Sequence, residues 1–348
     1  MTELIRRLDR RRFDIRVACF HREGAWLPRV EASAPVDAFP IRGFVRPTTI
    51  AQATTFARWC RRHRIRIVQT CDLYANVFAL PAAALAGVPV RVGSRRELNP
   101  DKTGAQIALQ RQTYRAAHAI VANSLAAKAQ LEREGVPENR VRVIPNGVSV
   151  ERFVPVPDVR PVQTFVTVAN LRPEKAHEIL LRAAALLVPS HPRLSFVIAG
   201  DGPRGAELRA MADRLGLADR VRFAGHVEDV PTLLAQAEAF VLPSTSEAFP
   251  NAAIEAMAAG LPVVASAVGG LLDLVDHGRT GVLVPPSDPS ALAGAMASLV
   301  SDPARAARLG AAAREEVAHR YSFDRMVRSF EDLYLTHLGL TAAESCAA

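Results

Sequence analysis

The chain has 348 residues, of which 49% are hydrophobic, 22% are charged and 6% are aromatic, and its formal net charge is +8. This length favours two domains, each with its own core, and the composition excludes a disordered chain. The few aromatic residues are not interleaved with the basic ones, which argues against a nucleic-acid surface and leaves an anionic membrane or a phosphate-bearing ligand as the partner of the positive charge.

An amphipathic helix with Leu4, Ile5 and Leu8 opens the chain, and short β-branched runs then alternate with longer helical runs. The expected strands are residues 14–20, 65–70, 88–93, 117–122, 140–144, 163–169, 194–200, 221–224, 239–242, 263–266 and 281–284. The expected helices between them include residues 50–63, 106–116 and 174–187. This alternation indicates parallel sheets covered on both faces, an α/β fold of doubly wound, Rossmann-like halves.

The two halves are separated where Pro155, Pro157 and Pro161 crowd together in residues 146–163, a composition typical of a linker. We therefore expect an N-terminal domain over residues 1–155, a C-terminal domain over 156–325, and a final segment over 326–348. Its helix is expected to pack back on the N-terminal domain. Two such halves would face a cleft at the carboxyl ends of both sheets, where ligands bind.

Neither metal-ligand spacing nor a secretory signal accompanies the four cysteines, which are Cys19, Cys60, Cys71 and Cys346. Reduced thiols in a cytoplasmic setting are therefore expected. The most apolar run, residues 75–92, is interrupted and falls short of the ~18 apolar residues that a spanning helix needs. The basic clusters at 6–12 and 61–66 are either solvated helix faces or contacts with the inner face of a membrane.

Two loops of the second half carry candidate ligand-binding residues. Arg172 and Lys175 lie between a strand and a helix, and only three of the 43 basic residues are lysines. A lysine kept at this junction favours a compact ammonium for a phosphate oxygen, the alternative being a surface lysine in a first helical turn. Gly200 and Gly202 permit a tight turn or close approach of a nucleotide, although turns of this kind commonly contain glycine.

Glu255 lies in an almost wholly apolar helix, which Pro250 begins and Gly260 ends. The free N–H groups at the start of this helix suit an anion. A buried carboxylate needs a partner, either a buried arginine or the hydroxyl groups of a ligand. Compensation of the helix dipole is a weaker explanation, because that effect fades after the first turn.

The stretch "SEAFPNAAIEAMAAGLPVVASAVGGLLDLV", in which Glu247 and Glu255 enclose seven residues, and "GRTGVLVPPSDPSALA" resemble the donor half of a known family. This family comprises the retaining nucleotide-sugar glycosyltransferases of GT-B fold, of the family 4 or group 1 type. "NLRPEK", "VIAGDGP", "VRFAGHV" and "VIPNGV" are also similar to its segments. The resemblance covers about residues 1–340 and is strong after Val143.

This resemblance implies that Glu247, Arg172 and Lys175 are catalytic. Arg172 and Lys175 would hold the diphosphate and stabilise it as it leaves, while Glu247 would face the sugar, either as a nucleophile or to position it. Glu255 would accept hydrogen bonds from the ribose. The other implied donor-binding residues are Gly200, Gly202, Gly225, His226, Val227, Ala248, Phe249, Pro250 and Asn251.

The sequence contains no D-x-D pair for a divalent ion, so we expect no metal and no other cofactor, with basic side chains and a helix dipole in its place. The resemblance implies transfer from a UDP- or GDP-sugar to a glycan or lipid-linked acceptor of a surface polysaccharide or glycolipid. A nucleotide-sugar epimerase and a nonenzymatic nucleotide-sugar-binding protein are the alternatives. On the acceptor side Asp72, Arg95 and His21 are candidates, each with a structural role as the alternative.

The first helix has no strand before it, although the first strand of a doubly wound half lies in the middle of its sheet. Without that strand, its two neighbours would have unpaired backbone groups. Members of the similar family also carry a glycine-rich turn there, which this sequence lacks. Two hypotheses follow: a start assigned too late, or a truncated and inactive relative.

Overall fold

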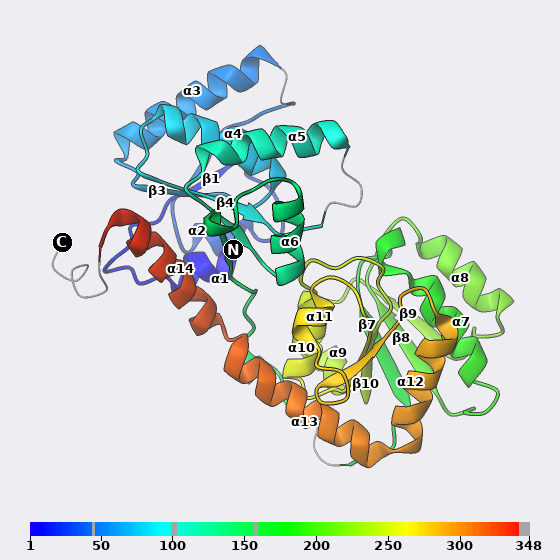
Figure 1. The fold of residues 1–348 in the computed structure, drawn as a ribbon. Helices are drawn as coiled ribbons and strands as arrows, with labels where there is room; N and C mark the ends of the chain where they lie inside the picture. The colour runs from blue at the N-terminus through cyan, green and yellow to red at the C-terminus, as the bar shows by residue number, and fades with distance from the viewer. Residues whose placement is uncertain (44–45, 99–102, 156–158, 341–348) are drawn as a thin grey trace. The chain divides into compact units, whose positions relative to one another are not determined.

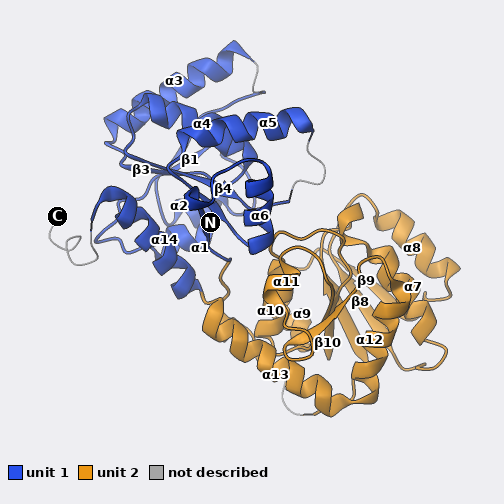
Figure 2. Cartoon of the chain, in the orientation of Figure 1, with its two compact units in different colours: residues 1–145, 323–348 blue, residues 146–322 orange. Residues whose placement is uncertain are grey.

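The computed structural model describes residues 1–43, 46–98, 103–155 and 159–340 (Figure 1). Pro157 and Cys346, named above, lie outside these residues. The chain divides into two compact units, drawn in different colours in Figure 2: unit 1 comprises residues 1–145 and 323–348, and unit 2 comprises residues 146–322. All strand pairs of the described residues are parallel, as the α/β prediction requires.

Unit 2 has a single six-stranded sheet in the order β12-β11-β10-β7-β8-β9. Its strands are β7 (Thr164–Val168), β8 (Ser195–Ala199), β9 (Val221–Gly225), β10 (Ala239–Leu242), β11 (Val263–Ser266) and β12 (Gly281–Val284). Its helices are α7 (His177–Leu187), α8 (Gly205–Arg214), α9 (Val230–Ala235), α10 (Asn251–Ala258), α11 (Leu271–Leu274), α12 (Pro289–Ser301) and α13 (Pro303–Arg320), with short 3-10 turns η3 (Val150–Arg152) and η4 (Pro173–Lys175). All six strands were predicted from the sequence.

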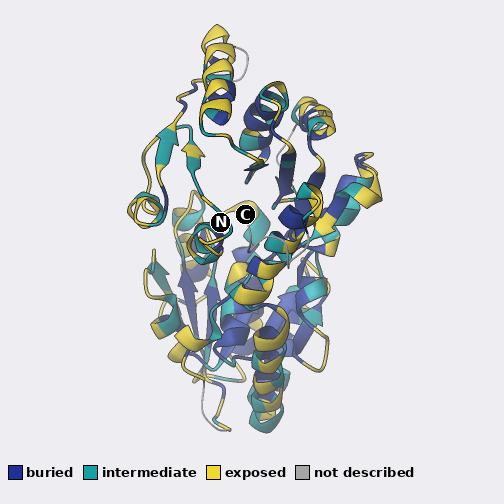
Figure 3. Ribbon diagram, turned by 90° about the vertical axis from the view of Figure 1, so that its left-hand side faces the viewer, coloured by how far each residue is buried: buried dark blue, intermediate teal, exposed yellow. Residues whose placement is uncertain are grey.

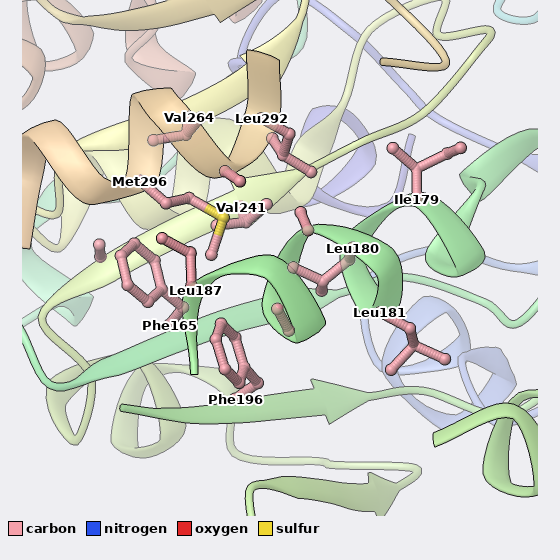
Figure 4. Packing of buried hydrophobic residues seen from close by; sticks show 14 of the residues in the cluster. Phe165, Ile179, Leu180, Leu181, Leu187, Phe196, Val241, Val264, Leu292 and Met296 are labelled. Atoms are coloured by element: carbon pink, nitrogen blue, oxygen red, sulfur yellow. The ribbon is translucent and has the colours of Figure 1, made fainter. Parts of the chain in front are cut away.

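Two apolar clusters cover the two faces of this sheet. On one face, leucines of α7 and Met296 of α12 pack over Phe165 and Phe196, whose stacked rings lie 5.9 Å apart (Figure 4). On the other face, α9, α10, α11 and the end of α13 pack over strands such as β10. Burial on both faces explains why these strands read as continuous apolar runs.

Unit 1 contains two sheets in its described residues. One pairs β1 (Val17–Cys19) with β2 (Val36–Ala38), and the other has the order β3-β4-β5-β6, with β3 (Ile67–Gln69), β4 (Val90–Arg95), β5 (Ala119–Ala122) and β6 (Val141–Val143). The helices are α1 (Thr2–Arg7), α2 (Leu27–Glu31), α3 (Pro47–Arg62), α4 (Leu73–Leu85), α5 (Gly104–Thr113), α6 (Leu125–Arg133) and α14 (Phe323–Leu338), with η1 (Tyr114–Ala116) and η2 (Glu138–Arg140). β2 was not predicted, because three residues are too few to show a period.

The two sheets of unit 1 belong to one layer. Phe20, directly after β1, and Val68 of β3 share an apolar cluster with α3 and α4. Ile15, shortly before β1, and Ile67 of β3 share a second cluster with α1 and α14. β1 and β3 are nevertheless not paired with each other or, on their facing edges, with another described strand.

The boundaries of the units differ from the expected ones. Val148 and Phe153 are buried in the core of unit 2, so the stretch expected to begin the linker is packed. In contrast, Phe330 and Tyr334 of α14 pack with Leu4 in unit 1. Figure 3 shows buried residues along the strands and exposed residues on the outer faces of the helices. None of the described helices is long and apolar enough to cross a membrane.

Candidate active site

The order of strands in unit 2 identifies where its ligand site should lie. β7 and β10 are adjacent in the centre of the sheet, and the chain continues to β8 on one side and to β11 on the other. Such a reversal of strand order is a topological switch point, outside whose carboxyl ends ligands bind in open α/β sheets. Lys175 follows β7 and Glu247 follows β10, so both side chains lie on loops at this point.

Lys175 and Glu247 are in direct contact. The Lys175 Nζ atom lies 2.6 Å from Glu247 Oε1, and the hydroxyl of Ser244 donates to the same oxygen at 2.8 Å. The Glu247 side chain is only 6% exposed, and no described residue donates a hydrogen bond to its Oε2 atom. One carboxylate oxygen is thus fixed by two donors, and the other is available to a ligand.

Backbone contacts hold the two loops together. The N–H of Thr245 donates to the carbonyl of Glu174 at 2.9 Å, which joins the loop after β10 to η4. η4 ends at Lys175 and is followed by Ala176, whose φ of 48° is left-handed and therefore unfavourable for alanine. This conformation reverses the chain between Lys175 and α7. Arg172, at the start of η4, is exposed, and no ion pair to it was found among the residues the structure describes.

Glu255 is half-buried, so it is less enclosed than the sequence predicted. α10 has eight residues and begins at Asn251, one residue after Pro250. Burial raises the pKa of the Glu255 carboxyl, and the positive charge of Arg152 partly offsets this effect. Within the described chain no side chain donates a hydrogen bond to it. A desolvated carboxylate without a donor is suited to accept hydrogen bonds from ligand hydroxyls.

Gly200 and Gly202 allow close contact between two loops. A Cβ atom at Gly200, whose φ is +138°, would lie 2.0 Å from the carbonyl oxygen of Ala169, and one at Gly202 would lie 2.6 Å from that of Leu171. These glycines therefore pack the loop after β8 against the loop after β7. Gly225 ends β9 and accepts a hydrogen bond from the N–H of Gly200 at 2.7 Å.

The remaining predicted donor residues differ in exposure. Val227 is partly buried against the core, and His226 is exposed. Ala248, Phe249 and Pro250 are buried, whereas Asn251 is exposed.

Sequence reasoning did not single out three residues that organise this site. They are Ser244, Asn146 and Gly270. Asn146 Nδ2 donates to Asn251 Oδ1 at 2.7 Å. A Cβ atom at Gly270 would lie 2.0 Å from the Ala248 carbonyl oxygen, and its N–H donates to the Glu247 carbonyl at 2.8 Å. The double glycine at 269–270 was the available signal, because it follows a strand and precedes a helix.

The acceptor-side candidates of unit 1 have separate surroundings. Arg95 is 1% exposed and pairs with Glu134, with 2.7 Å between Nη2 and Oε1, and it also donates to Gln110 at 3.0 Å. These contacts indicate that Arg95 is part of a structural ion pair. Asp72 caps α4 by accepting from the N–H of Ala75 at 2.8 Å. His21 is exposed and lines a cavity.

No group of three or more His, Cys, Asp and Glu side chains arranged to hold a metal ion was found in the described ranges. Cys19, Cys60 and Cys71 are free thiols.

The chain has the GT-B fold, as comparison with solved structures shows. Anabaena Alr3699/HepE, solved in complex with UDP, superposes with a TM-score of 0.83 over 92% of both chains at 23% identity. The lipopolysaccharide outer core galactosyltransferase WaaB in its apo form gives a TM-score of 0.74 over 92% of this chain and 89% of that one, at 20% identity.

Sequence comparison identifies the family. The model of glycosyl transferases group 1 matches residues 158–316, and that of glycosyltransferase family 4 matches residues 1–152. A D-inositol 3-phosphate glycosyltransferase of Streptomyces scabiei is 31% identical, and the alignment covers 93% of this chain and 82% of the relative. The chain therefore belongs to the group 1, family 4 glycosyltransferases, and the resemblance read from its motifs is confirmed.

Proposed function

We propose that this enzyme transfers a sugar from a UDP- or GDP-sugar, with retention of anomeric configuration, to a glycan or lipid-linked acceptor of a surface polysaccharide or glycolipid. The observation that carries the proposal is the contact between Lys175 and Glu247 at the switch point of unit 2. HepE, whose fold this chain shares, has been solved with UDP and with UDP-glucose, which supports a nucleotide-sugar donor.

The proposed chemistry concentrates charge at the two loops. The bond between the anomeric carbon and the diphosphate oxygen breaks, and the electron pair leaves with the nucleoside diphosphate. Lys175 and Arg172 stabilise this developing negative charge, and preorganised charges of this kind give a large part of catalysis. Because two cations already serve the leaving group, we propose that no metal ion or other cofactor takes part.

Other residues hold the donor. The free Oε2 atom of Glu247 faces a sugar hydroxyl, while Ser244 and Lys175 fix the opposite oxygen. Glu255 accepts hydrogen bonds from the ribose. The backbone at 248–251 contacts the sugar, and the loop at 225–227 contacts the base.

We further propose that the enzyme works at the inner face of the cytoplasmic membrane. The exposed face of α3 carries Arg58, Arg61 and Arg62, and this helix contains no acidic residue. Basic surfaces of this kind attract anionic lipids, by about 1 kcal/mol per basic residue close to the membrane.

Calorimetric titration of UDP, GDP and their glucose conjugates, with a product assay on candidate acceptors, tests the donor site. Glu255→Gln should weaken nucleotide binding by about 10-fold or more, because hydrogen bonds to a charged group contribute roughly 1.5–3 kcal/mol. Glu315→Gln, an exposed change on α13, is the matched control. Unchanged affinity of the Glu255 variant would remove this residue from the site, and release of an epimer without acceptor would contradict transfer.

A further inference from the structure

Unit 1 contains a cavity of about 780 Å³ whose lining includes none of the residues assigned to the donor. It lies where β1 and β2 end and α3 begins, and it is lined by His21, Pro40, Arg42, Arg46, Pro47, Thr48 and Gln52. Because the two strands are parallel, their carboxyl ends meet at this edge of the layer. The edge is the one at which ligands bind in open α/β folds.

The lining of this cavity is basic. His21, Arg42 and Arg46 supply three of its seven residues, and none of the seven is acidic. No ion pair of these three side chains occurs within the described ranges of the chain. Between Asp37 and Asp72 the sequence has seven arginines and no acidic residue, so no local carboxylate neutralises them. The unpaired guanidinium groups of Arg42 and Arg46 favour an anionic occupant of the cavity.

The charge of unit 1 as a whole is also positive, whereas that of unit 2 is not. Unit 1 has 27 basic and 16 acidic residues, whereas unit 2 has 16 basic and 19 acidic residues. The diphosphate-binding groups proposed above, Arg172 and Lys175, are in unit 2 and do not explain the positive charge of unit 1. The α3 arginines proposed to meet the membrane account for part of it, which leaves Arg42 and Arg46 at the cavity for a further anionic partner.

We propose that the cavity binds a phosphate group of the acceptor, which is therefore a phosphate-bearing sugar, polyol or lipid. Two guanidinium groups can each form paired hydrogen bonds with phosphate oxygens. Thr48 and Gln52 of the same lining are placed to contact hydroxyl groups of the acceptor. This inference rests on the proposed function, because it assigns the occupant as the acceptor.

The experiment measures binding of inorganic phosphate, glucose 6-phosphate and inositol 1-phosphate, beside glucose and inositol, to the full chain. Saturating UDP keeps the phosphates from the donor site. We expect at least one phosphate compound to bind, its unphosphorylated counterpart not to bind, and Arg42→Gln/Arg46→Gln to weaken binding at least 10-fold. Arg58→Gln/Arg62→Gln, on the exposed face of α3, is the matched control and should bind normally.

The outcomes separate the two proposals. If neither UDP nor GDP binds the unaltered protein, the proposed function fails; if only GDP binds, GDP replaces UDP in this experiment. If a nucleotide binds but no phosphate compound does, or the Arg42/Arg46 variant binds as tightly as the control, the cavity proposal is overturned while the donor proposal stands.

Phosphatidylcholine vesicles with phosphatidic acid distinguish a lipid phosphate from a soluble one. Because Arg58 and Arg62 lie on the face proposed above to meet the membrane, the control in this experiment is Arg115→Gln/Arg133→Gln, which changes two exposed arginines elsewhere in unit 1. Vesicle binding lost only in the Arg42/Arg46 variant supports a lipid-linked acceptor in this cavity. Equal loss in both variants indicates diffuse surface attraction and excludes the lipid as occupant.

Discussion

The two units use the same parallel α/β layer differently. Unit 2 has one sheet of six strands, and its central loops bring a lysine and a glutamate into contact. Unit 1 has two sheets in the described residues, a large excess of basic side chains, and a cavity on its outer pair of strands. The continuous sheet of unit 2 fixes its functional loops relative to one another. Unit 1 instead has a cavity lined by basic side chains that make no ion pairs among the described residues.

The largest expected effect concerns the buried ion pair of unit 1, whose role we assign as structural. Arg95→Met leaves Glu134 buried without its cation and should lower the free energy of unfolding by about 3–5 kcal/mol. Amide hydrogen exchange, read separately for each unit, measures this loss. The pair Arg95→Met/Glu134→Leu should recover most of it, and UDP affinity should stay unchanged. A stable single variant that cannot bind acceptor would instead restore Arg95 as an acceptor-side residue.

The next effect concerns the lysine of unit 2. Lys175→Ala should lower kcat by about 10²-fold or more with the fold intact, because one preorganised charge stabiliser contributes roughly 3 kcal/mol to the transition state. Steady-state kinetics with the natural or a surrogate acceptor measures it. Lys128→Ala removes a partly exposed lysine of unit 1 and should leave kcat unchanged. A change in KM alone would show that Lys175 binds the donor without assisting its departure.

Acid should destabilise unit 2 through His177, which is 1% exposed and has no hydrogen-bond partner on either ring nitrogen among the described residues. Burial, with the charges of Lys175 and Arg204, lowers its pKa from 6.5 to about 4. The unfolded chain therefore takes up a proton first, and stability falls as the pH drops from 6.5 towards 4, by up to about 3 kcal/mol. Urea unfolding across this range should lose that slope in His177→Gln and retain it in the control His319→Gln.

The smallest expected effect tests Ala176, the left-handed residue between η4 and α7. Ala176→Gly should raise the stability of unit 2 by about 1 kcal/mol or less, because glycine adopts this conformation without the Cβ clash but loses more backbone entropy on folding. Ala210→Gly, at an exposed position inside α8, should lower stability by about 1 kcal/mol. Thermal unfolding of both variants measures the contrast, and a loss in Ala176→Gly would show that the conformation carries no strain.

Local sequence patterns predicted the α/β class and all six strands of unit 2, and they supplied the candidate residues of its proposed site. These features are local: β-branched runs, helix signals, and motif strings such as the one holding Glu247 and Glu255. Strand β2 could not be predicted from the sequence, since three residues show no period. The basic residues of the cavity could be read individually, but not their convergence with His21.

Which residues are in contact depends on the tertiary structure. Lys175 and Glu247 are 72 positions apart, and their contact depends on β7 lying beside β10. The burial of Arg95 depends on Glu134, which a different element supplies. Sequence patterns report the face that a residue presents and the turn that follows it, whereas the pairing of distant strands follows from the packing of the whole unit. For this reason the candidates were predictable and their contacts were not.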